Sequence, residues 1–167
     1  GWDAALARGE VRDIAVIGGG VAGVELALAT QHRVPGLRVR ILERGRVLAP
    51  LPPASRAALL SVLKSRDIEI LEDADVAEIR QSHLSLKDGS EIAADIVIGA
   101  AGARAQAWLG VSDLPTQAGY VSVRPSLQSL SHGNVYAAGD CADLSFAPRP
   151  KAGVFAVRAA PVLAANL

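Results

Sequence analysis

The chain has 167 residues, 50% of them hydrophobic and 20% charged, which is enough for a folded domain with its own core. Its 17 Lys and Arg residues balance its 17 Asp and Glu residues, and this argues against nucleic acid as the main partner. One cysteine, Cys141, excludes an intramolecular disulfide, and the histidines have no metal-ligand spacing, so no metal site is predicted. No apolar run has the length of a transmembrane segment, and we expect a cytoplasmic protein, either free or peripheral to a membrane.

The first informative stretch runs from Arg12 to Thr30. Ile14 to Ile17 form a short β-branched run typical of a strand that is buried on both faces. Three glycines with the spacing G-x-G-x-x-G follow, at Gly18, Gly20 and Gly23. The residues from Val21 to Thr30 are rich in Ala and Leu and predict a helix. A strand, a glycine turn and a helix in this order are the context of a dinucleotide-binding fingerprint.

Each glycine has its own expected role in such a site. Gly18 allows a tight turn, Gly20 lets the backbone approach a pyrophosphate, and Gly23 lets the helix pack close to the sheet. The helix would direct its unpaired N–H groups and the positive end of its dipole at the phosphates, with Val21 and Ala22 at its start. The alternative is that the glycines form only a turn.

The next strand, Leu37 to Glu43, ends in an acid that lies 20 residues after Gly23. A carboxylate at this distance can accept hydrogen bonds from the adenine ribose hydroxyls, although Glu43 could also be only a solvated strand end. Glu43 would repel a 2′-phosphate, which favours NADH over NADPH. Arg44 and Arg46 could bind such a phosphate if Glu43 turned away.

The middle of the chain predicts the rest of a doubly wound parallel sheet. Pro53 suits the first position of a helix that runs to about Ser65, and Ile68 to Leu71 predict a third strand. A fourth buried strand is expected at Asp95 to Gly99, followed by a loop of small residues, Ala100 to Arg104, where backbone could approach a ligand or simply turn. Between the third and fourth strands lie three short alternating segments, which predict a β-meander: Val76 to Gln81, His83 to Lys87 and Glu91 to Ala94.

The last third of the chain contains a second informative stretch. After a short helix and loop and a strand at Tyr120 to Val123, a strand predicted at Val135 to Ala138 ends in Gly139 and Asp140. An acid in this position can bind a chain of sugar-like hydroxyls, although on these residues alone a helix cap is favoured for Asp140. A helix from Ala152 to Leu167, interrupted or kinked near Pro161, completes the chain, and its start could face an anionic ligand.

Three ordered motifs together resemble the pyridine nucleotide–disulfide oxidoreductase superfamily: G-x-G-x-x-G-V-E at Gly18 to Glu25, the strand at Asp95 to Gly102, and V-Y-A-A-G-D at Val135 to Asp140. Within it, the tail from Pro148 to Leu167 looks most like the NADH dehydrogenase-like domain fused to selenide, water dikinase. Type II NADH dehydrogenases are the next relatives.

The resemblance implies a role for each matching residue. Members carry NAD(P)H and FAD on two Rossmann-like domains, and the glycine turn here matches the NAD(H) site, with Glu43 on the adenosine ribose. The further residues that the resemblance assigns to cofactors are Glu25 near the nicotinamide, Gly102 at the passage to the FAD domain, Gly139 and Asp140 on the ribitol or pyrophosphate side of FAD, and Lys151, Ala152, Gly153 and Val154 at the start of a helix facing the flavin.

The chain departs from the family pattern because only one G-x-G-x-x-G is present. We therefore predict an α/β fold in which residues 1–104 form a Rossmann-like NAD(H)-binding domain with a β-meander insertion, and residues 105–167 form the closing strand–helix piece of an FAD-binding domain. The sequence begins at Gly1 and has no Met, and we expect a piece of a longer protein whose FAD-domain half is missing. Such a piece should not bind FAD tightly alone.

The implied function is the NAD(H)-binding portion of a flavin-dependent oxidoreductase that passes hydride from NAD(P)H to FAD. The fragment alone is expected to be inactive, with no catalytic side chain required. The alternative is a non-catalytic NAD(H)-binding regulatory module attached to another enzyme. Apolar surface that normally packs on the missing half makes a homo-oligomer plausible.

Overall fold

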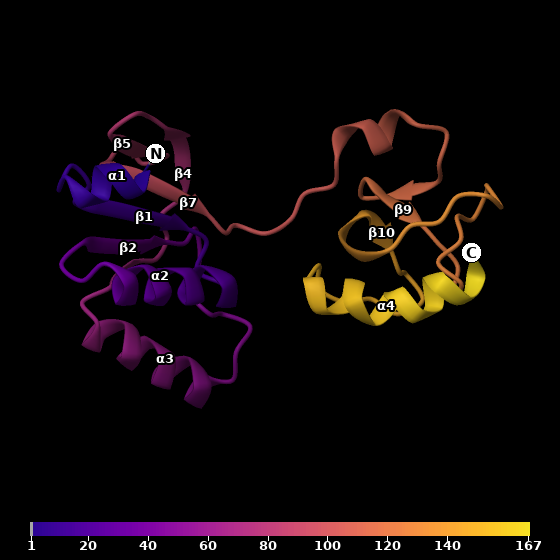
Figure 1. Cartoon of the computed structure of the whole chain (residues 1–167), viewed down its shortest axis with the longest axis horizontal. Helices are drawn as coiled ribbons and strands as arrows, with labels where there is room; N and C mark the ends of the chain where they lie inside the picture. The colour runs from indigo at the N-terminus through magenta and orange to yellow at the C-terminus, as the bar shows by residue number, and fades with distance from the viewer. Residues whose placement is uncertain (1) are drawn as a thin grey trace. The chain divides into compact units, whose positions relative to one another are not determined.

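The computed structural model describes residues 2–167, apart from the side chains of Trp2 and Asp3. Gly1, the first residue of the predicted nucleotide-binding domain, therefore lies outside the described residues. The chain divides into two compact units, Gly1–Ala101 and Gly102–Leu167 (Figure 1). This division falls close to the predicted boundary at Arg104, while the assignment of one part to NAD(H) and the other to FAD stays a prediction. Each unit is described by itself.

The first unit alternates helices and strands before a meander, and one further strand follows the meander. Its elements are α1 (Trp2–Ala7), β1 (Asp13–Ile17), α2 (Val21–Arg33), β2 (Arg38–Leu42), α3 (Pro53–Ser65), β3 (Glu69–Leu71), β4 (Val76–Ile79), β5 (His83–Leu86), β6 (Glu91–Ala93) and β7 (Ile96–Gly99). The predicted strands and helices of this region are all present, with ends shifted by a few residues at most. The mixed α/β fold with a Rossmann-like parallel sheet is therefore confirmed.

Strands β1, β2, β3 and β7 form one parallel sheet in the order β3-β2-β1-β7. In the centre of the sheet, Ile14 of β1 lies beside Val39 of β2 and Ile96 of β7. Ile14, Ala15 and Val16 are fully buried, as expected for a central strand covered on both faces. The β-branched residues of these strands suit this position because their side chains pack well on a pleated surface.

The two faces of the sheet are covered by different elements. Helices α2 and α3 pack on one face, where Val24, Ala27 and Leu63 join the sheet residues in one core cluster. The meander strands β4, β5 and β6 form an antiparallel sheet, and its Leu84 and Leu86 belong to the core cluster of the other face (Figure 1). The predicted β-meander is therefore present, and it lies on the face where a doubly wound sheet would carry further crossover helices.

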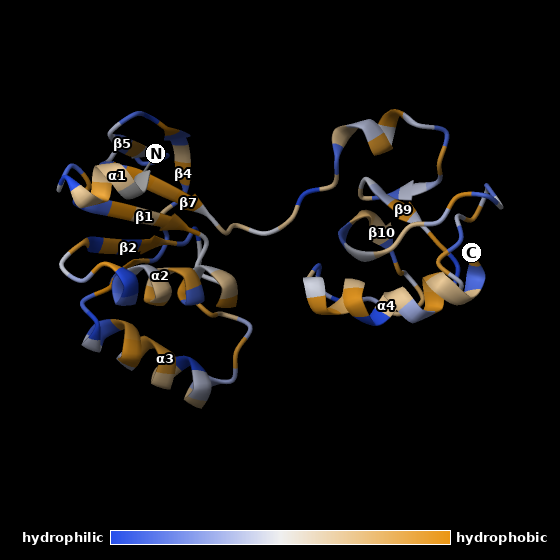
Figure 2. Cartoon of the chain, viewed as in Figure 1, coloured by the Kyte–Doolittle hydropathy of each residue, from blue (hydrophilic) through white to orange (hydrophobic). Residues whose placement is uncertain are grey.

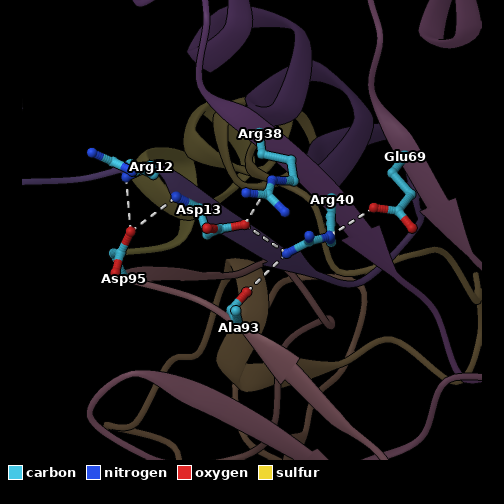
Figure 3. A network of polar contacts seen from close by, with 7 residues as sticks. All are labelled: Arg12, Asp13, Arg38, Arg40, Glu69, Ala93 and Asp95. Atoms are coloured by element: carbon cyan, nitrogen blue, oxygen red, sulfur yellow. Dashed lines mark hydrogen bonds and ion pairs between the residues drawn. The ribbon is translucent and has the colours of Figure 1, made fainter. Parts of the chain in front are cut away.

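An ion-pair network ties together the amino ends of the strands (Figure 3). The Arg40 guanidinium donates to Asp13 Oδ1 at 2.9 Å, to Glu69 Oε2 at 2.7 Å and to the Ala93 carbonyl oxygen at 3.0 Å. The Asp95 carboxylate, just before β7, accepts a hydrogen bond from the Asp13 N–H at 2.9 Å. The network thereby joins β1, β2, β3 and the segment from Ala93 to Asp95 that leads into β7, at the edge of the sheet away from the glycine turn.

The second unit is a smaller fold around its own core. Its elements are the 3₁₀ helix η1 (Ala107–Val111), β8 (Thr116–Gln117), β9 (Tyr120–Ser122), the 3₁₀ helix η2 (Gly139–Cys141), β10 (Ala142–Asp143) and helix α4 (Gly153–Asn166). The three strands form a small sheet in the order β10-β9-β8. Leu109, Val121, Val123 and Leu127 are buried in its centre.

The prediction of a strand at Val135 to Ala138 is wrong. This segment makes only an isolated bridge, between Tyr136 and Gln128, although Ala138 has an extended backbone. A strand needs a neighbour that accepts and donates along its whole length, and the segment around Gln128 is too short to continue the ladder. The strand in this part of the unit is β10, which follows the Gly139–Asp140 pair instead of preceding it.

Helix α4 is continuous through Pro161, so the predicted interruption does not occur, whereas the alternative of a kink stays a prediction. Pro161 has no N–H to donate to the Val157 carbonyl, and Val157 is 73% exposed. Ala159 and Leu163 of the helix pack against the core. In Figure 2 most of α4 is drawn in orange tones, which mark hydrophobic residues. Among residues 2–167, no helix has both the length and the hydrophobicity to cross a membrane.

Candidate nucleotide-binding site

The candidate site lies at the carboxyl edge of the parallel sheet, where strand order reverses. β2 lies on one side of β1 and β7 on the other, which makes the loop after β1 a topological switch point. The loop after β7 is bound to this point, since the Ala100 N–H donates to the Ile17 carbonyl oxygen at 2.7 Å. The Gly18 N–H in turn donates to the Leu42 carbonyl oxygen of β2 at 2.8 Å. Backbone hydrogen bonds therefore bring the ends of three strands together.

Gly18 and Gly23 are required by the way the turn packs. Gly18 has φ +110°, and a Cβ atom there would strike the backbone of Ala100 and Ala101. A Cβ atom on Gly23 would strike the carbonyl oxygen of Gly18. Gly23 thus lets helix α2 approach the turn itself, which refines its expected role of bringing the helix close to the sheet.

Gly20 differs from its two neighbours in the motif because no atom lies within 4 Å of the position a Cβ would take. It is the N-cap of α2, and the first α-helical bond is donated by the Val24 N–H to the Gly20 carbonyl oxygen. The N–H groups of Gly20, Val21, Ala22 and Gly23 precede that bond, and no side chain caps them. No acid lies in the first turn of the helix to neutralise its positive end. This open, electropositive turn fits an anionic group such as a pyrophosphate.

Glu43 is half-buried at the end of β2 and is tied to the turn. Its Oε2 accepts a hydrogen bond from the Gly19 N–H at 2.7 Å, and its Oε1 accepts one from the Gly45 N–H at 3.1 Å. Glu43 is therefore more than a solvated strand end. A carboxylate has about four acceptor positions, so two are left for hydroxyl groups.

Other residues predicted for this site lie at its margin. Glu25 is exposed on α2, and Arg44 is exposed beside Glu43. Arg46 lines a shallow groove against α3 and β3 together with Arg56 and Glu72, and no residue of the glycine turn lines this groove. Gly102, with φ +92°, begins the second unit.

In the second unit, part of the predicted set surrounds a cavity of about 430 Å³. Gly139, Asp140 and Ala152 line it, whereas Gly153 and Val154 do not. Gly139 has φ +67°, and a Cβ there would lie 3.0 Å from Ala156 Cβ, so glycine allows α4 to pack close.

The surroundings of Asp140 decide against its role as a helix cap. Ala152 is the N-cap of α4, and Asp140 lies in the 3₁₀ helix η2 with an exposed side chain.

Lys151 Nζ donates to the Ala142 carbonyl oxygen and lies 4.1 Å from the centroid of the Tyr120 ring. The Cys141 thiol donates to the Ala138 carbonyl oxygen at 3.2 Å. In the part of the chain that the structure describes, no group of three or more His, Cys, Asp or Glu residues could hold a metal ion.

Sequence reasoning missed the residues that support the turn. Gly19 is also crowded, because a Cβ there would lie 2.6 Å from Val47 Cγ2. The Leu48 N–H donates to the Gly19 carbonyl oxygen at 2.7 Å. Three successive glycines were a visible signal for Gly19. Glu72 accepts a hydrogen bond from the Val47 N–H. It lies 53 positions after Gly19, and no pattern in the sequence connects the two residues.

The fold and the glycine turn define a Rossmann-like dinucleotide-binding class of protein. A model of the pyridine nucleotide-disulphide oxidoreductase family matches residues 3–160, and the chain belongs to this family.

Similar proteins include a type II NADH:quinone oxidoreductase of Haemophilus influenzae, which is 32% identical over 79% of this chain and 33% of its own length. The human ferroptosis suppressor protein 1 is 28% identical over 93% of this chain and 45% of its own length. Among solved structures, reduced CoADR-RHD of Bacillus anthracis has a TM-score of 0.78 at 25% identity, with 97% of this chain and 30% of that chain covered. The chain thus spans less than half the length of these relatives.

Proposed function

We infer that the chain is the NAD(H)-binding portion of a flavin-dependent oxidoreductase. The observation that supports this most is the glycine turn at the switch point, where Gly20 leaves open space and the N–H groups at the start of α2 have no cap. Membership of the family and the resemblance to NADH:quinone oxidoreductase support the class of reaction.

NADH fits the residues of the turn. The N–H groups from Gly20 to Gly23 would hold the pyrophosphate, and the free acceptor positions of Glu43 would take the adenine ribose hydroxyls. NADH is favoured over NADPH because Glu43 is held by the Gly19 and Gly45 N–H groups and does not turn away without leaving both unpaired. Arg46 lines a groove with Arg56 and Glu72 that no residue of the glycine turn lines, which leaves Arg44 as the cation beside Glu43.

FAD fits the second unit only in part. Gly139, Asp140 and Ala152 lie around one cavity, and the exposed carboxylate of Asp140 would hold a ribitol or ribose hydroxyl. The rest of the FAD site would come from sequence beyond this chain, as the coverage of the relatives suggests. With both cofactors in place, hydride would pass from the nicotinamide to the flavin. The residues of this chain would bind and align the rings, with no acid or base required for that step.

Calorimetric titration of the chain with NADH, and with NADPH in parallel, tests the proposal. We expect NADH to bind at least about ten-fold more tightly than NADPH, because the 2′-phosphate would face the Glu43 carboxylate. Gly20→Ala is the matched variant, since its new methyl group meets no protein atom but enters the space assigned to the pyrophosphate. It should stay folded and lose NADH affinity. Equal NADH binding by wild type and variant would contradict the proposed position of the pyrophosphate, and absence of NADH binding would contradict the proposed function.

The full-length protein separates the enzyme from a regulatory module. An enzyme should oxidise NADH in the presence of an electron acceptor. A module that only binds NAD(H) would leave the NADH absorbance unchanged under the same conditions.

A further inference from the structure

Gly19 is held by the protein on three sides. Its N–H donates to Glu43 Oε2 at 2.7 Å, and its carbonyl oxygen accepts from the Leu48 N–H at 2.7 Å. Its Cα faces the buried side chain of Val47, whose Cγ2 would lie 2.6 Å from any Cβ at this position. The orientation of this residue therefore depends on the segment from Gly45 to Leu48, which packs against the turn.

Val47 in this segment is fixed by two side chains from elsewhere in the first unit. The Glu72 carboxylate, after β3, accepts a hydrogen bond from the Val47 N–H through Oε1 at 2.8 Å. The Arg56 guanidinium, on α3, donates to the Val47 carbonyl oxygen through Nε at 2.7 Å. The same Glu72 Oε1 lies 2.6 Å from Arg56 Nη2. Both backbone polar groups of Val47 are thus paired with one charged pair.

We propose that Glu72 and Arg56 are positioning residues of the nucleotide site, an inference that rests on the proposed NAD(H) function of the glycine turn. They fix the peptide groups of Val47, and through Val47 and Leu48 they set the orientation of Gly19. The next N–H groups along the chain, at Gly20 and Val21, are those assigned to the pyrophosphate. Glu72 and Arg56 act on the ligand only through this segment.

The pair is suited to this role by its burial and its chemistry. The side chain of Arg56 is 18% exposed and that of Glu72 is 33% exposed, so the pair is screened less than a surface ion pair. Hydrogen bonds to a charged group are shorter and stronger than neutral ones. Val47 itself is fully buried, so removing either partner leaves a backbone group of Val47 without its partner in a buried place.

The chain supplies a matched control at the other end of β3. Glu69 also pairs with an arginine, with its Oε2 2.7 Å from Arg40 Nε, but this pair lies in the network at the amino edge of the sheet. Glu69→Ala and Glu72→Ala therefore each remove an ion pair with an arginine, the first at the start of β3 and the second just after its end.

The test is NADH titration of the wild-type chain and both variants, with thermal unfolding measured alongside. We expect Glu72→Ala to raise the NADH Kd about ten-fold and Glu69→Ala to leave it within about two-fold, with the loss of Tm larger for Glu72→Ala because it also leaves the buried Val47 N–H unpaired. Glu72→Gln keeps an oxygen for the Val47 N–H and should recover affinity to within about three-fold of wild type. Recovery by this conservative variant, together with unchanged affinity in Glu69→Ala, is the result that a positioning role requires.

The other outcomes overturn the proposal. Wild-type NADH affinity in Glu72→Ala, or equal losses in Glu69→Ala and Glu72→Ala, would overturn the positioning role and leave the proposed function intact. Absence of NADH binding by the wild type would overturn the proposed function and this inference with it. If Glu72→Ala does not fold, Arg56→Met keeps an unbranched aliphatic side chain but removes the hydrogen bonds to the Val47 carbonyl oxygen and to Glu72, and its unchanged NADH affinity would likewise reject the role.

Discussion

At the scale of single residues, the glycines of one motif serve different physical purposes. Gly18 and Gly23 are needed because backbone atoms occupy the places their Cβ atoms would take, whereas Gly20 faces open space. The first two are thus requirements of folding, and the third is available for a ligand. The sequence spacing predicted different roles for the three glycines, and the packing shows which backbone atoms crowd Gly18 and Gly23.

Gly23→Ala should lower the free energy of unfolding by about 1–3 kcal/mol, because the new methyl group forces helix α2 away from the Gly18 carbonyl oxygen. Gly20→Ala should lower it by only about 0.5 kcal/mol, the difference between these residues at an N-cap. Chemical denaturation of both variants measures the contrast. Equal stability of the two variants would contradict the close approach of α2 to the turn.

The carboxylate of Asp95 gives the stability a dependence on pH. Hydrogen bonds from the Arg12 N–H at 2.7 Å and the Asp13 N–H at 2.9 Å hold the pKa of Asp95 below its usual value. Because the folded state favours the ionised form, this contribution is complete above the unfolded pKa of about 4. It is lost as the pH falls through the lower folded pKa.

Asp95→Asn should therefore destabilise the chain at pH 7, because the amide is a weaker acceptor for the two N–H groups. The difference in Tm between variant and wild type should shrink as the pH is lowered below about 4. Thermal unfolding of both proteins from pH 7 to pH 3 provides the measurement. A difference that stays constant over this range would argue against the ionised carboxylate as the acceptor.

At the scale of elements, local signals predicted helices better than short strands. Helix α3 begins at Pro53 and ends at Ser65, as predicted, because a proline at the first position and the leucine pattern are both local. The strand predicted at Val135 to Ala138 failed because pairing depends on a neighbour that the sequence does not reveal. Helix α4 was expected to be interrupted or kinked near Pro161, and it continues through this residue.

Pro161→Ala should stabilise the second unit by about 1–3 kcal/mol, since it restores an N–H donor to Val157 and removes the ring from the helix interior. Helical circular dichroism and thermal unfolding of the chain would detect the gain. Loss of stability would mean that the proline contributes packing that its exposed position does not suggest.

At the scale of the whole molecule, the two units differ in how complete they are. The first has a core on each face of its parallel sheet and contains the whole glycine turn with its supports. The second leaves much of α4 uncovered, with Val154, Val157 and Val162 among its exposed hydrophobic residues. The chain spans less than half the length of these relatives, and exposed hydrophobic residues of this kind are typical of a surface that packs against another part of a protein.

Residues 1–101 expressed alone should keep the NADH affinity of the whole chain to within about three-fold, because Gly18, Glu43, Val47, Glu72 and Ala100 all belong to the first unit. Calorimetric titration of the shortened protein checks this. A large loss of affinity in a folded product would show that the second unit contributes to the NADH site.

The sequence by itself determined the family, the order of the strands and helices in the first unit, and the position of the glycine turn. These depend on hydrophobic periodicity and on residues close together in the chain, which act through local conformation. Only the tertiary structure decided that the meander covers one face of the sheet, that Glu43 is tied to Gly19, and that Glu72 and Arg56 support the turn. Such contacts join residues distant in sequence, and packing in three dimensions brings them together.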